Sequence, residues 1–355
     1  MQNKNDFINR LNKSTSYPYV LAEIGANHNG DMNLAYKLID AAKASGADGV
    51  KFQSWDNRIF SKEVYKRNYF LGDDYRERKD HSLHSIVAEY SLNSDQFRDL
   101  CDYCQKVSID FSSTPFEIDQ VEVLDRLEVP FIKIASMDID NFELLDAAAS
   151  TRRPVILSTG FSELEEVVAA VEFIKSYKGV SMALLHCISL YPPEDKEVNL
   201  RNMMLFAKEF ECPIGFSDHT MGSEASLAAV ALGASFIEKH FTLDKKMNGW
   251  DHAISADAAE LTNICVGTKR VFDMLGQETR ILSDSLRERA GSYRRSIVAA
   301  RDIKKGEVLS SSMITYKRPG TGIPPSQARH VIGMRSLCFI HQDQVILSDM
   351  LGQEL

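Results

Sequence analysis

The chain has 355 residues, of which 44% are hydrophobic and 26% are charged, a composition that is ordinary for a globular protein. Its formal net charge of -9 argues against a surface that binds nucleic acid or anionic membranes. The first residues form no apolar signal-peptide core, and no apolar run approaches the ~20 residues of a membrane span. Six cysteines without a framework spacing fit a reducing compartment, so we expect a cytoplasmic protein.

One cysteine pair, Cys101 and Cys104, forms a C-x-x-C motif, which can bind zinc or carry out redox chemistry in other proteins. Phe97 and Leu100 precede it at helical spacing, and no second pair of cysteines lies nearby. We therefore expect a buried helix face here and keep the zinc or redox role as the alternative.

Short apolar runs alternate with longer helical patterns from residue 19 to about residue 281. The runs typical of strands are 19–23, 49–52, 110–114, 131–135, 155–158 and 182–187, with two more inside 214–241. The helical patterns are 33–45, 94–106, 117–126, 142–150, 163–177, 200–210, 223–232 and 258–275. The strands are apolar on both faces, as a buried parallel sheet requires. Eight β–α units in roughly 260 residues predict an α/β protein with a (β/α)8 (TIM) barrel.

Two regions fall outside this alternation. Residues 54–90 are polar and aromatic, and they are much longer than a usual β–α loop, which predicts a lid or a binding loop. Residues 284–295 are basic without an apolar face, and short β-type runs follow them. We therefore expect a barrel domain at 1–283, a linker at 284–295 and a small β-rich domain at 296–355.

The carboxyl ends of the strands form the active face of a TIM barrel, and here those ends are unusually polar. Lys51 and Lys133 are expected inside the barrel, where an ammonium group is costly to desolvate without a counter-anion. The hydroxyl side chains at neighbouring strand ends are Thr114, Ser136 and Ser158. Together these groups suggest a phosphate or carboxylate ligand. The alternative is that the lysines pair with internal acids such as Glu23 and Glu238.

His219 and His240 end two successive strands, which parallel pairing would bring side by side. By strand parity Glu238 shares the face of His240, whereas Asp218 lies on the face opposite to His219. A lone barrel histidine is often structural, but two on adjacent strand ends beside carboxylates favour a metal such as Mn²⁺. His186 lies within a strand, and we expect it in the core or in contact with the ligand residues rather than as a third ligand.

A series of short motifs runs through the chain in order. The motifs are Glu23-Ile-Gly-Ala-Asn-His-Asn-Gly, Val50-Lys-Phe-Gln, Ser113-Thr-Pro-Phe, Lys133-Ile-Ala-Ser, Leu157-Ser-Thr-Gly, Leu185-His-Cys, Tyr191-Pro, Gly215-Phe-Ser-Asp-His-Thr, Ile237-Glu-Lys-His-Phe and Lys317-Arg-Pro-Gly-Thr-Gly. Jointly they resemble the sialic acid (N-acetylneuraminate) synthase family over nearly the whole chain. The end of the chain resembles the SAF (antifreeze-like) domain found in those enzymes.

The resemblance implies an enzyme, a transferase that forms a C–C bond. Such enzymes condense phosphoenolpyruvate with an N-acetylated hexosamine such as N-acetylmannosamine, giving a nine-carbon 2-keto sugar acid and phosphate. The resemblance also implies a domain-swapped homodimer that needs a divalent metal. We expect Mn²⁺, with Mg²⁺ and Co²⁺ as alternatives.

The family's site residues carry over to the matching positions of this chain. The metal ligands would be His219 and His240. The groups holding phosphoenolpyruvate would be Lys51, Thr114, Lys133, Ser136, Ser158 and Ser217. The groups contacting the amino sugar would be Gln53, Tyr191, Glu238 and Asp251, with Arg318 reaching the site of a partner subunit.

The implied reaction begins with attack of C3 of phosphoenolpyruvate on the sugar aldehyde, polarised by the metal. Water captures the resulting cation at C2, and Glu23 is expected to manage the proton of that water. The tetrahedral intermediate then expels phosphate by C–O cleavage. Glu23, His219 and His240 are therefore the expected catalytic residues.

Two segments, three residues in all, depart from many N-acetylneuraminate synthases. Ile188 and Ser189 stand where Thr-Asn is common, so a contact of Ser189 with substrate would be lost or made through water. Trp250 stands where a proline is common and would reshape the sugar pocket. The main alternative acceptor is therefore a 2,4-diacetamido hexose, as in legionaminate and pseudaminate synthases.

Two further readings remain. One is a 3-deoxy-ulosonate phosphate synthase, against which the small C-terminal domain with Arg318 speaks. The other is a non-catalytic carbohydrate- or ice-binding protein that works through its tail, against which the polar strand ends speak.

Overall fold

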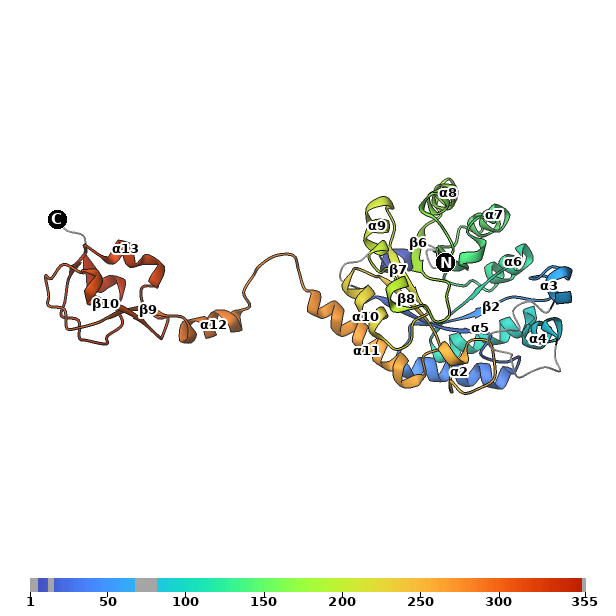
Figure 1. Cartoon of the computed structure of the whole chain (residues 1–355), viewed down its shortest axis with the longest axis horizontal. Helices are drawn as coiled ribbons and strands as arrows, with labels where there is room; N and C mark the ends of the chain where they lie inside the picture. The colour runs from blue at the N-terminus through green and yellow to red at the C-terminus, as the bar shows by residue number, and fades with distance from the viewer. Residues whose placement is uncertain (1–5, 12–15, 68–81, 353–355) are drawn as a thin grey trace. The chain divides into compact units, whose positions relative to one another are not determined.

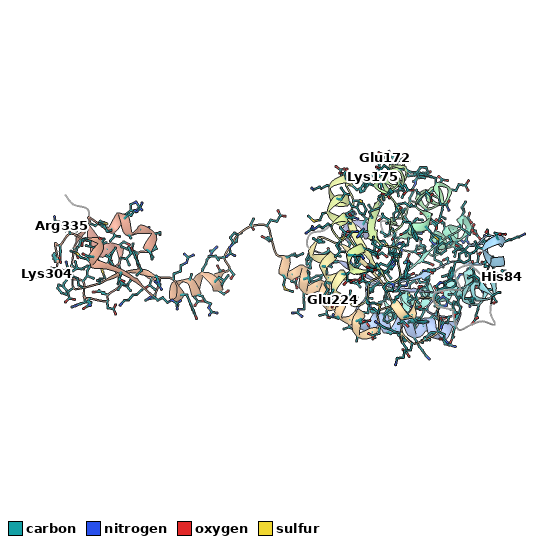
Figure 2. The ribbon with its side chains drawn as sticks, viewed as in Figure 1. His84, Glu172, Lys175, Glu224, Lys304 and Arg335 are labelled. Atoms are coloured by element: carbon teal, nitrogen blue, oxygen red, sulfur yellow. The ribbon has the colours of Figure 1, made fainter. Side chains whose placement is uncertain are left out.

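The computed structural model describes residues 6–11, 16–67 and 82–352. The chain divides into two compact units, Met1–Gly276 and Gln277–Leu355. In the first unit the helices surround the strands, as Figure 1 shows. Figure 2 shows charged side chains on the outer helices, such as those of Glu172 and Lys175.

Eight parallel strands form the sheet of the first unit. They are β1 (Tyr19–Gly25), β2 (Gly49–Gln53), β3 (Asp110–Thr114), β4 (Ile132–Ile134), β5 (Val155–Ser158), β6 (Met182–Cys187), β7 (Ile214–Asp218) and β8 (Phe236–His240). Their order is β3-β2-β1-β8-β7-β6-β5-β4, so the first and last strands pair. Between the ends of this series, the Ser112 hydroxyl donates to the carbonyl of Phe131 at 2.9 Å. The predicted (β/α)8 barrel is confirmed.

The outer helices lie close to their predicted positions. They are α2 (Met32–Ser45), α5 (Ser94–Val107), α6 (Ile118–Arg126), α7 (Phe142–Ser150), α8 (Leu164–Lys175), α9 (Asn202–Glu209), α10 (Glu224–Ala231) and α11 (Ala258–Leu275). Local signals fix several ends: Asn93 and Gln96 form a capping box at the start of α5, and Gly46 ends α2 at a φ of 93°. Cys101 and Cys104 are free and buried on α5, which confirms the expected helix face.

The long stretch after β2 contains two helices where the sequence suggested a loop. They are α3 (Lys62–Arg67) and α4 (Leu83–Tyr90). Leu83, Ile86 and Val87 are fully buried, so α4 packs as part of the domain instead of lying loose over it. Residues 68–81 of the expected lid lie outside the described residues.

Successive side chains of a strand alternate between the barrel interior and the helices, and the interior changes character along its axis. At the amino end the interior is aromatic: Tyr19, Phe131 and Phe236. Above these lies an aliphatic layer: Leu21, Ile156, Ala183 and Leu185. Gly49 leaves room for this packing, because a Cβ there would lie 2.2 Å from the Tyr19 hydroxyl. The next inward positions are polar and form the layer described in the following subsection.

The second unit has a small core of its own. Its elements are α12 (Asp284–Tyr293), β9 (Ser296–Ala299), β10 (Ile314–Lys317), α13 (Ala328–Val331), β11 (Arg335–Ser336) and β12 (Leu351–Gly352). β9 pairs with β10 and β11 pairs with β12, both antiparallel. The core residues include Ile297, Ile303, Leu309, Ile323, Ile340 and Ile346. The expected linker at 284–295 contains α12, which buries none of its side chains.

Short 3-10 helices complete the described part of the chain. They are Ser136–Asp138, Asp195–Glu197, His252–Ile254, Ser311–Met313, Pro325–Gln327 and Ser348–Met350. Among the described residues, no helix combines the length and the apolar character needed to cross a membrane.

The short helix α1 (Asp6–Leu11) packs against the aromatic end of the barrel interior. The ring centroid of Phe7 lies 5.0 Å from that of Tyr19 and 4.7 Å from that of Phe131. We expect Phe7→Ala to lower the free energy of unfolding by about 3 kcal/mol, because it removes a ring from a packed aromatic cluster. Urea denaturation measures this. Met274→Ala, at a side chain 69% exposed on α11, is the control, and equal losses would contradict the role of α1.

Candidate active site

A single pocket gathers most of the predicted site residues at the carboxyl ends of the strands. All eight strands, or the residues just after them, contribute to it. Its lining is Glu23, Lys51, Gln53, Thr114, Phe116, Lys133, Ala135, Ser136, Met137, Ser158, Phe161, Cys187, Ser189, Tyr191, Ser217, His219, Glu238 and His240. Strand register brings these side chains together, since Glu23 is opposite both Lys51 and His240, and Ser217 is opposite Glu238.

Two ammonium groups and two carboxylates form the floor of this pocket. Lys51 Nζ lies 2.7 Å from Glu23 Oε2 and donates to Thr114 Oγ1 at 2.8 Å. Glu238 Oε1 lies 3.9 Å from the ammonium groups of both Lys51 and Lys133. All four side chains are at least nine-tenths buried. Because desolvation of an ion costs several kcal/mol, this arrangement depends on mutual neutralisation.

Lys133 is less completely neutralised than Lys51. Its ammonium donates to Ser158 Oγ at 2.6 Å and to the carbonyl of Ile134 at 3.1 Å, which leaves one N–H without a hydrogen-bond acceptor among the described residues. Burial lowers the pKa of Lys133, although Glu238 opposes the shift. The sequence left open that both lysines pair with internal acids. Lys51 does pair closely with Glu23, whereas Lys133 lies farther from its acid and can bind an anion.

Glu23 is placed to exist in either protonation state near neutral pH. Its Oε1 accepts from Gln53 Nε2 at 3.0 Å, and its other oxygen faces Lys51. Burial raises the pKa of Glu23 to about 7, although the charge of Lys51 acts in the opposite direction. A carboxyl group with this property suits proton transfer.

Glu238 behaves differently from Glu23. Burial alone would raise its pKa, but Lys133 and Lys51 lower it below the ordinary value. Its Oε1 accepts from the Ser217 hydroxyl at 3.1 Å, whereas its Oε2 is buried without a hydrogen-bond partner. That oxygen can accept a hydrogen bond from a ligand without breaking an existing contact.

The two histidines meet at the rim of the polar layer. The ring centroids of His219 and His240 lie 5.4 Å apart, and the Tyr191 ring stacks on His219 at 4.1 Å. His219 Nδ1 lies 2.8 Å from the carbonyl of Ile188, which can only accept, so Nδ1 carries a proton and Nε2 is the nitrogen available to a metal. His240 Nδ1 is buried without a hydrogen-bond partner, 3.7 Å from Asp251 Oδ2.

These histidines fit the divalent metal that the family implies. Burial lowers the pKa of His240, which keeps its imidazole in the neutral form that binds metals. Burial also lowers the pKa of His219, but Cys187 and the Ile188 carbonyl raise it to about 9, so a metal there would displace a proton. Among the described residues, no group of three or more His, Cys, Asp and Glu could hold a metal ion. Two imidazoles with water and substrate oxygens make the donor set that remains.

Several residues highlighted by the sequence lie outside the pocket lining. Asp251 lies beside His240 as described above. Arg318 belongs to the second unit, where its guanidinium lies 5.4 Å from the ring centroid of Tyr293. His186 is buried with its Nε2 2.7 Å from the carbonyl of Val198, which confirms the expected core role.

The lining also includes residues that the sequence did not bring forward. These are Phe116, Ala135, Met137, Phe161 and Cys187. The signal for Cys187 was available, because it alternates with His186 and therefore lies on the opposite, inward face of β6. The other four come shortly after strand ends, with Met137 in the 3-10 helix Ser136–Asp138 and the rest in loops, where no periodicity indicates direction.

The chain matches the NeuB family over residues 38–280 and the SAF domain over residues 294–352. It is 38% identical over 330 residues to the N,N'-diacetyllegionaminic acid synthase of Campylobacter jejuni, covering 92% of this chain and 98% of that protein. It is 34% identical over 342 residues to the N-acetylneuraminate-9-phosphate synthase of Homo sapiens, covering 94% and 92%.

Among solved structures, the N-acetylneuraminic acid (sialic acid) synthetase of Leptospira borgpetersenii, in complex with citrate, is similar at a TM-score of 0.68 and 35% identity. The match covers 77% of this chain and 90% of that chain. The expected family and the SAF domain are thereby confirmed, as is the expectation of an enzyme. The chain belongs to the NeuB family of synthases and carries a C-terminal SAF domain.

Proposed function

We propose that the chain condenses phosphoenolpyruvate with an N-acetylated hexosamine of the N-acetylmannosamine type and water, giving a nine-carbon 2-keto sugar acid and phosphate. The observation that carries the proposal is the pair of buried ammonium groups, Lys51 and Lys133, that open on one pocket. The pocket has four hydroxyls beside them: Thr114, Ser136, Ser158 and Ser217. Such a set of cations and donors suits a small, highly anionic substrate.

The two substrates would divide this pocket between them. Lys51, Lys133 and the four hydroxyls would hold the phosphate and carboxylate of phosphoenolpyruvate. The open-chain sugar would contact the residues nearer the histidines: Gln53, Ser189, Tyr191, Glu238 and Asp251. The unpartnered oxygen of Glu238 supports this division, because a sugar hydroxyl would supply its missing donor.

His219 and His240 would hold the divalent metal, for which Mn²⁺ is the best candidate given nitrogen and oxygen ligands. When bound, such an ion supplies Lewis acidity that polarises the sugar aldehyde. The Ile188 carbonyl orients one imidazole for this task by fixing its Nδ1–H.

The protein groups would then guide the remaining steps. C3 of phosphoenolpyruvate forms a bond to the aldehyde carbon as the C=O π bond breaks, and water captures the electron deficiency that develops at C2. The aldehyde oxygen becomes a hydroxyl by taking up a proton, which the captured water balances by losing one. The Glu23 carboxylate takes the proton from this water, and Lys51 at 2.7 Å stabilises the charge of that carboxylate beforehand. Phosphate leaves from the tetrahedral intermediate by C–O cleavage, with the lysines and hydroxyls stabilising its negative charge.

A second candidate differs only in the acceptor. Identity to the N,N'-diacetyllegionaminic acid synthase, at 38%, exceeds identity to the N-acetylneuraminate-9-phosphate synthase, at 34%. This favours a 2,4-diacetamido hexose as an acceptor to be tested beside N-acetylmannosamine. Trp250, whose ring centroid lies 4.7 Å from that of Trp55, is next to Asp251 and would shape the sugar side of the site.

We further propose a domain-swapped homodimer in which Arg318 reaches the partner's sugar site. The Lys317-Arg-Pro-Gly-Thr-Gly motif within the SAF domain supports this assembly. Light scattering measures the mass in solution, and a monomer would contradict the proposal.

A cytoplasmic location is supported by six free cysteines, and cell fractionation tests it. We also keep the boundaries 1–283, 284–295 and 296–355 as proposed domain limits, which limited proteolysis tests.

The acceptor class can be identified from the product. With phosphoenolpyruvate and Mn²⁺, we expect phosphate release only when an N-acetylated hexosamine is added. The product mass should equal that of sugar, phosphoenolpyruvate and water together, less that of phosphate. Parallel reactions with N-acetylmannosamine, a 2,4-diacetamido hexose and an aldopentose phosphate separate the three synthase activities by mass spectrometry. Phosphate release without any sugar would refute the proposed acceptor class.

Glu23→Gln separates catalysis from binding. We expect kcat to fall by roughly 10² to 10⁴, because the amide cannot accept the proton of the attacking water. The Kd for phosphoenolpyruvate should stay within about threefold, since the lysines and hydroxyls remain. Steady-state kinetics and calorimetric titration measure the two quantities. Glu172→Gln, on the outer face of α8 (Figure 2), is the matched control, and an unchanged kcat in the Glu23 variant would remove this residue from the mechanism.

Lys133→Met should weaken the binding of phosphoenolpyruvate, which Glu23→Gln should leave nearly unchanged. We expect the Kd for phosphoenolpyruvate to rise by roughly 10- to 100-fold, because one charged hydrogen bond to the substrate is lost. Methionine keeps the length of the side chain, and Glu238 keeps Lys51 as a counter-ion at 3.9 Å, so the barrel should remain folded. Lys175→Met on α8 is the control (Figure 2). Unaltered binding by the Lys133 variant would contradict the placement of the substrate.

A further inference from the structure

A histidine at the carboxyl end of β7 and another at that of β8 line the pocket, and the charged residue before each lies on the opposite face. Asp218 directly precedes His219, and Lys239 directly precedes His240. The two charged residues are opposite each other in the strand register. Because side chains alternate along a strand, Asp218 and Lys239 lie behind the two histidines, on the helix-covered side of the barrel.

We propose that Asp218 and Lys239 form a positioning pair, which sets the spacing of His219 and His240 and thereby the affinity of the site for a divalent metal. This inference rests on the metal site proposed above. Neither residue lines the pocket, so the pair acts through the backbone and never touches the ion.

The first argument is the density of contacts around the residue that follows His219. Thr220 donates its N–H to Asp218 Oδ1 at 2.8 Å and its hydroxyl to the same oxygen at 2.7 Å. The carbonyl of Thr220 accepts from the Lys239 ammonium. The residues before and after His219 are thus hydrogen-bonded to each other. Lys239, the residue next to His240, donates a further hydrogen bond to the second of them.

The second argument is that the pair joins the two strands directly. Lys239 Nζ lies 3.0 Å from Asp218 Oδ2, and both side chains are at most 1% exposed. The Ser226 hydroxyl of α10 also donates to Asp218 Oδ2 at 2.6 Å. A displacement of one strand end relative to the other would therefore break this buried ion pair, whose carboxylate is also held by a hydrogen bond from α10.

The third argument is energetic. Apolar residues of similar volume often replace a buried ion pair without loss of stability, so stability alone is a weak reason for this pair. The hydrogen bonds and the ion pair of Asp218 and Lys239 are directional, so they fix the distance between the two strand ends, which apolar packing does not. On the pocket side, the Ile188 carbonyl fixes the ring of His219 in the same way.

The test measures Mn²⁺ affinity of the full-length protein in the absence of substrates, by titration with detection of free Mn²⁺ by electron paramagnetic resonance. We expect Asp218→Asn and Lys239→Met each to weaken Mn²⁺ binding by roughly 10- to 100-fold, the range seen when groups that orient metal ligands are lost. The double variant Asp218→Asn/Lys239→Met leaves no unpaired buried charge and should fold even where a single variant does not. It should show the same weakening, because the neutral pair does not hold the strand ends.

An ion pair away from the pocket, with Arg153 buried and the Asp125 side chain 40% exposed, serves as the control. Arg153, 7% exposed, contacts Asp125 Oδ1 at 2.6 Å just before β5, at the opposite end of the barrel from the pocket. Arg153→Met should lower the melting temperature and leave Mn²⁺ affinity unchanged. His219→Ala and His240→Ala define complete loss of a ligand.

The outcomes separate the two proposals. Wild-type affinity in the folded double variant overturns the positioning role and leaves the metal site intact. A wild-type protein that binds no Mn²⁺, or whose affinity is unaffected by His219→Ala and His240→Ala, overturns the metal site and the positioning role with it. Weakening in the Arg153 control equal to that in the double variant also overturns the inference, since general destabilisation would then explain it.

Discussion

The neutralisation of four charges inside the barrel is the constraint on which the site depends. Lys51, Lys133, Glu23 and Glu238 occupy inward positions of four different strands, directly above an aliphatic layer that excludes water. None of them could remain ionised there alone, because each ion costs several kcal/mol to desolvate. The balance is close but incomplete: among the described residues, one N–H of Lys133 and one oxygen of Glu238 have no hydrogen-bond partner. These two gaps are the places where the proposed anionic substrate and the sugar would complete the network.

Strand parity explains why much of this site was predictable from sequence. In a buried parallel strand the apolar residues do not reveal which face is inward, but polar residues spaced by two near the carboxyl end must share one face. Lys51 and Gln53 on β2, and Glu238 and His240 on β8, are spaced by two and therefore had to share a face. The same rule separated Asp218 from His219, and the ion pair of Asp218 with Lys239 follows it. The strand boundaries were equally well determined, because short apolar runs between helical patterns leave little freedom.

The parts that could not be predicted depend on contacts between distant segments. Helix α4 is buried by packing against the barrel, whereas its short sequence within a polar stretch carries a weak local signal. Helix α12 buries no side chain, so no apolar periodicity could indicate it. Only one of two adjacent residues on a strand can face the pocket, and on β6 this residue is Cys187, whereas His186 lies in the core. The contact of Arg318 with the Tyr293 ring likewise depends on tertiary folding. The two residues are 25 positions apart, so no local pattern predicts that they meet.

The barrel assigns different tasks to its two ends and to the two faces of its strands. At the amino end Phe7, Tyr19 and Phe131 pack as an aromatic cluster, which contributes stability and carries no chemistry. At the carboxyl end a buried atom such as His240 Nδ1 lacks a partner, at a cost of about 1 to 3 kcal/mol for such a group. Because the apolar core offsets that cost, the inward faces can keep polar atoms free for ligands. The outward faces of β7 and β8 carry Asp218 and Lys239, which we propose fix the positions of the two histidines. This matters because a free polar atom binds a ligand well only while its position is fixed.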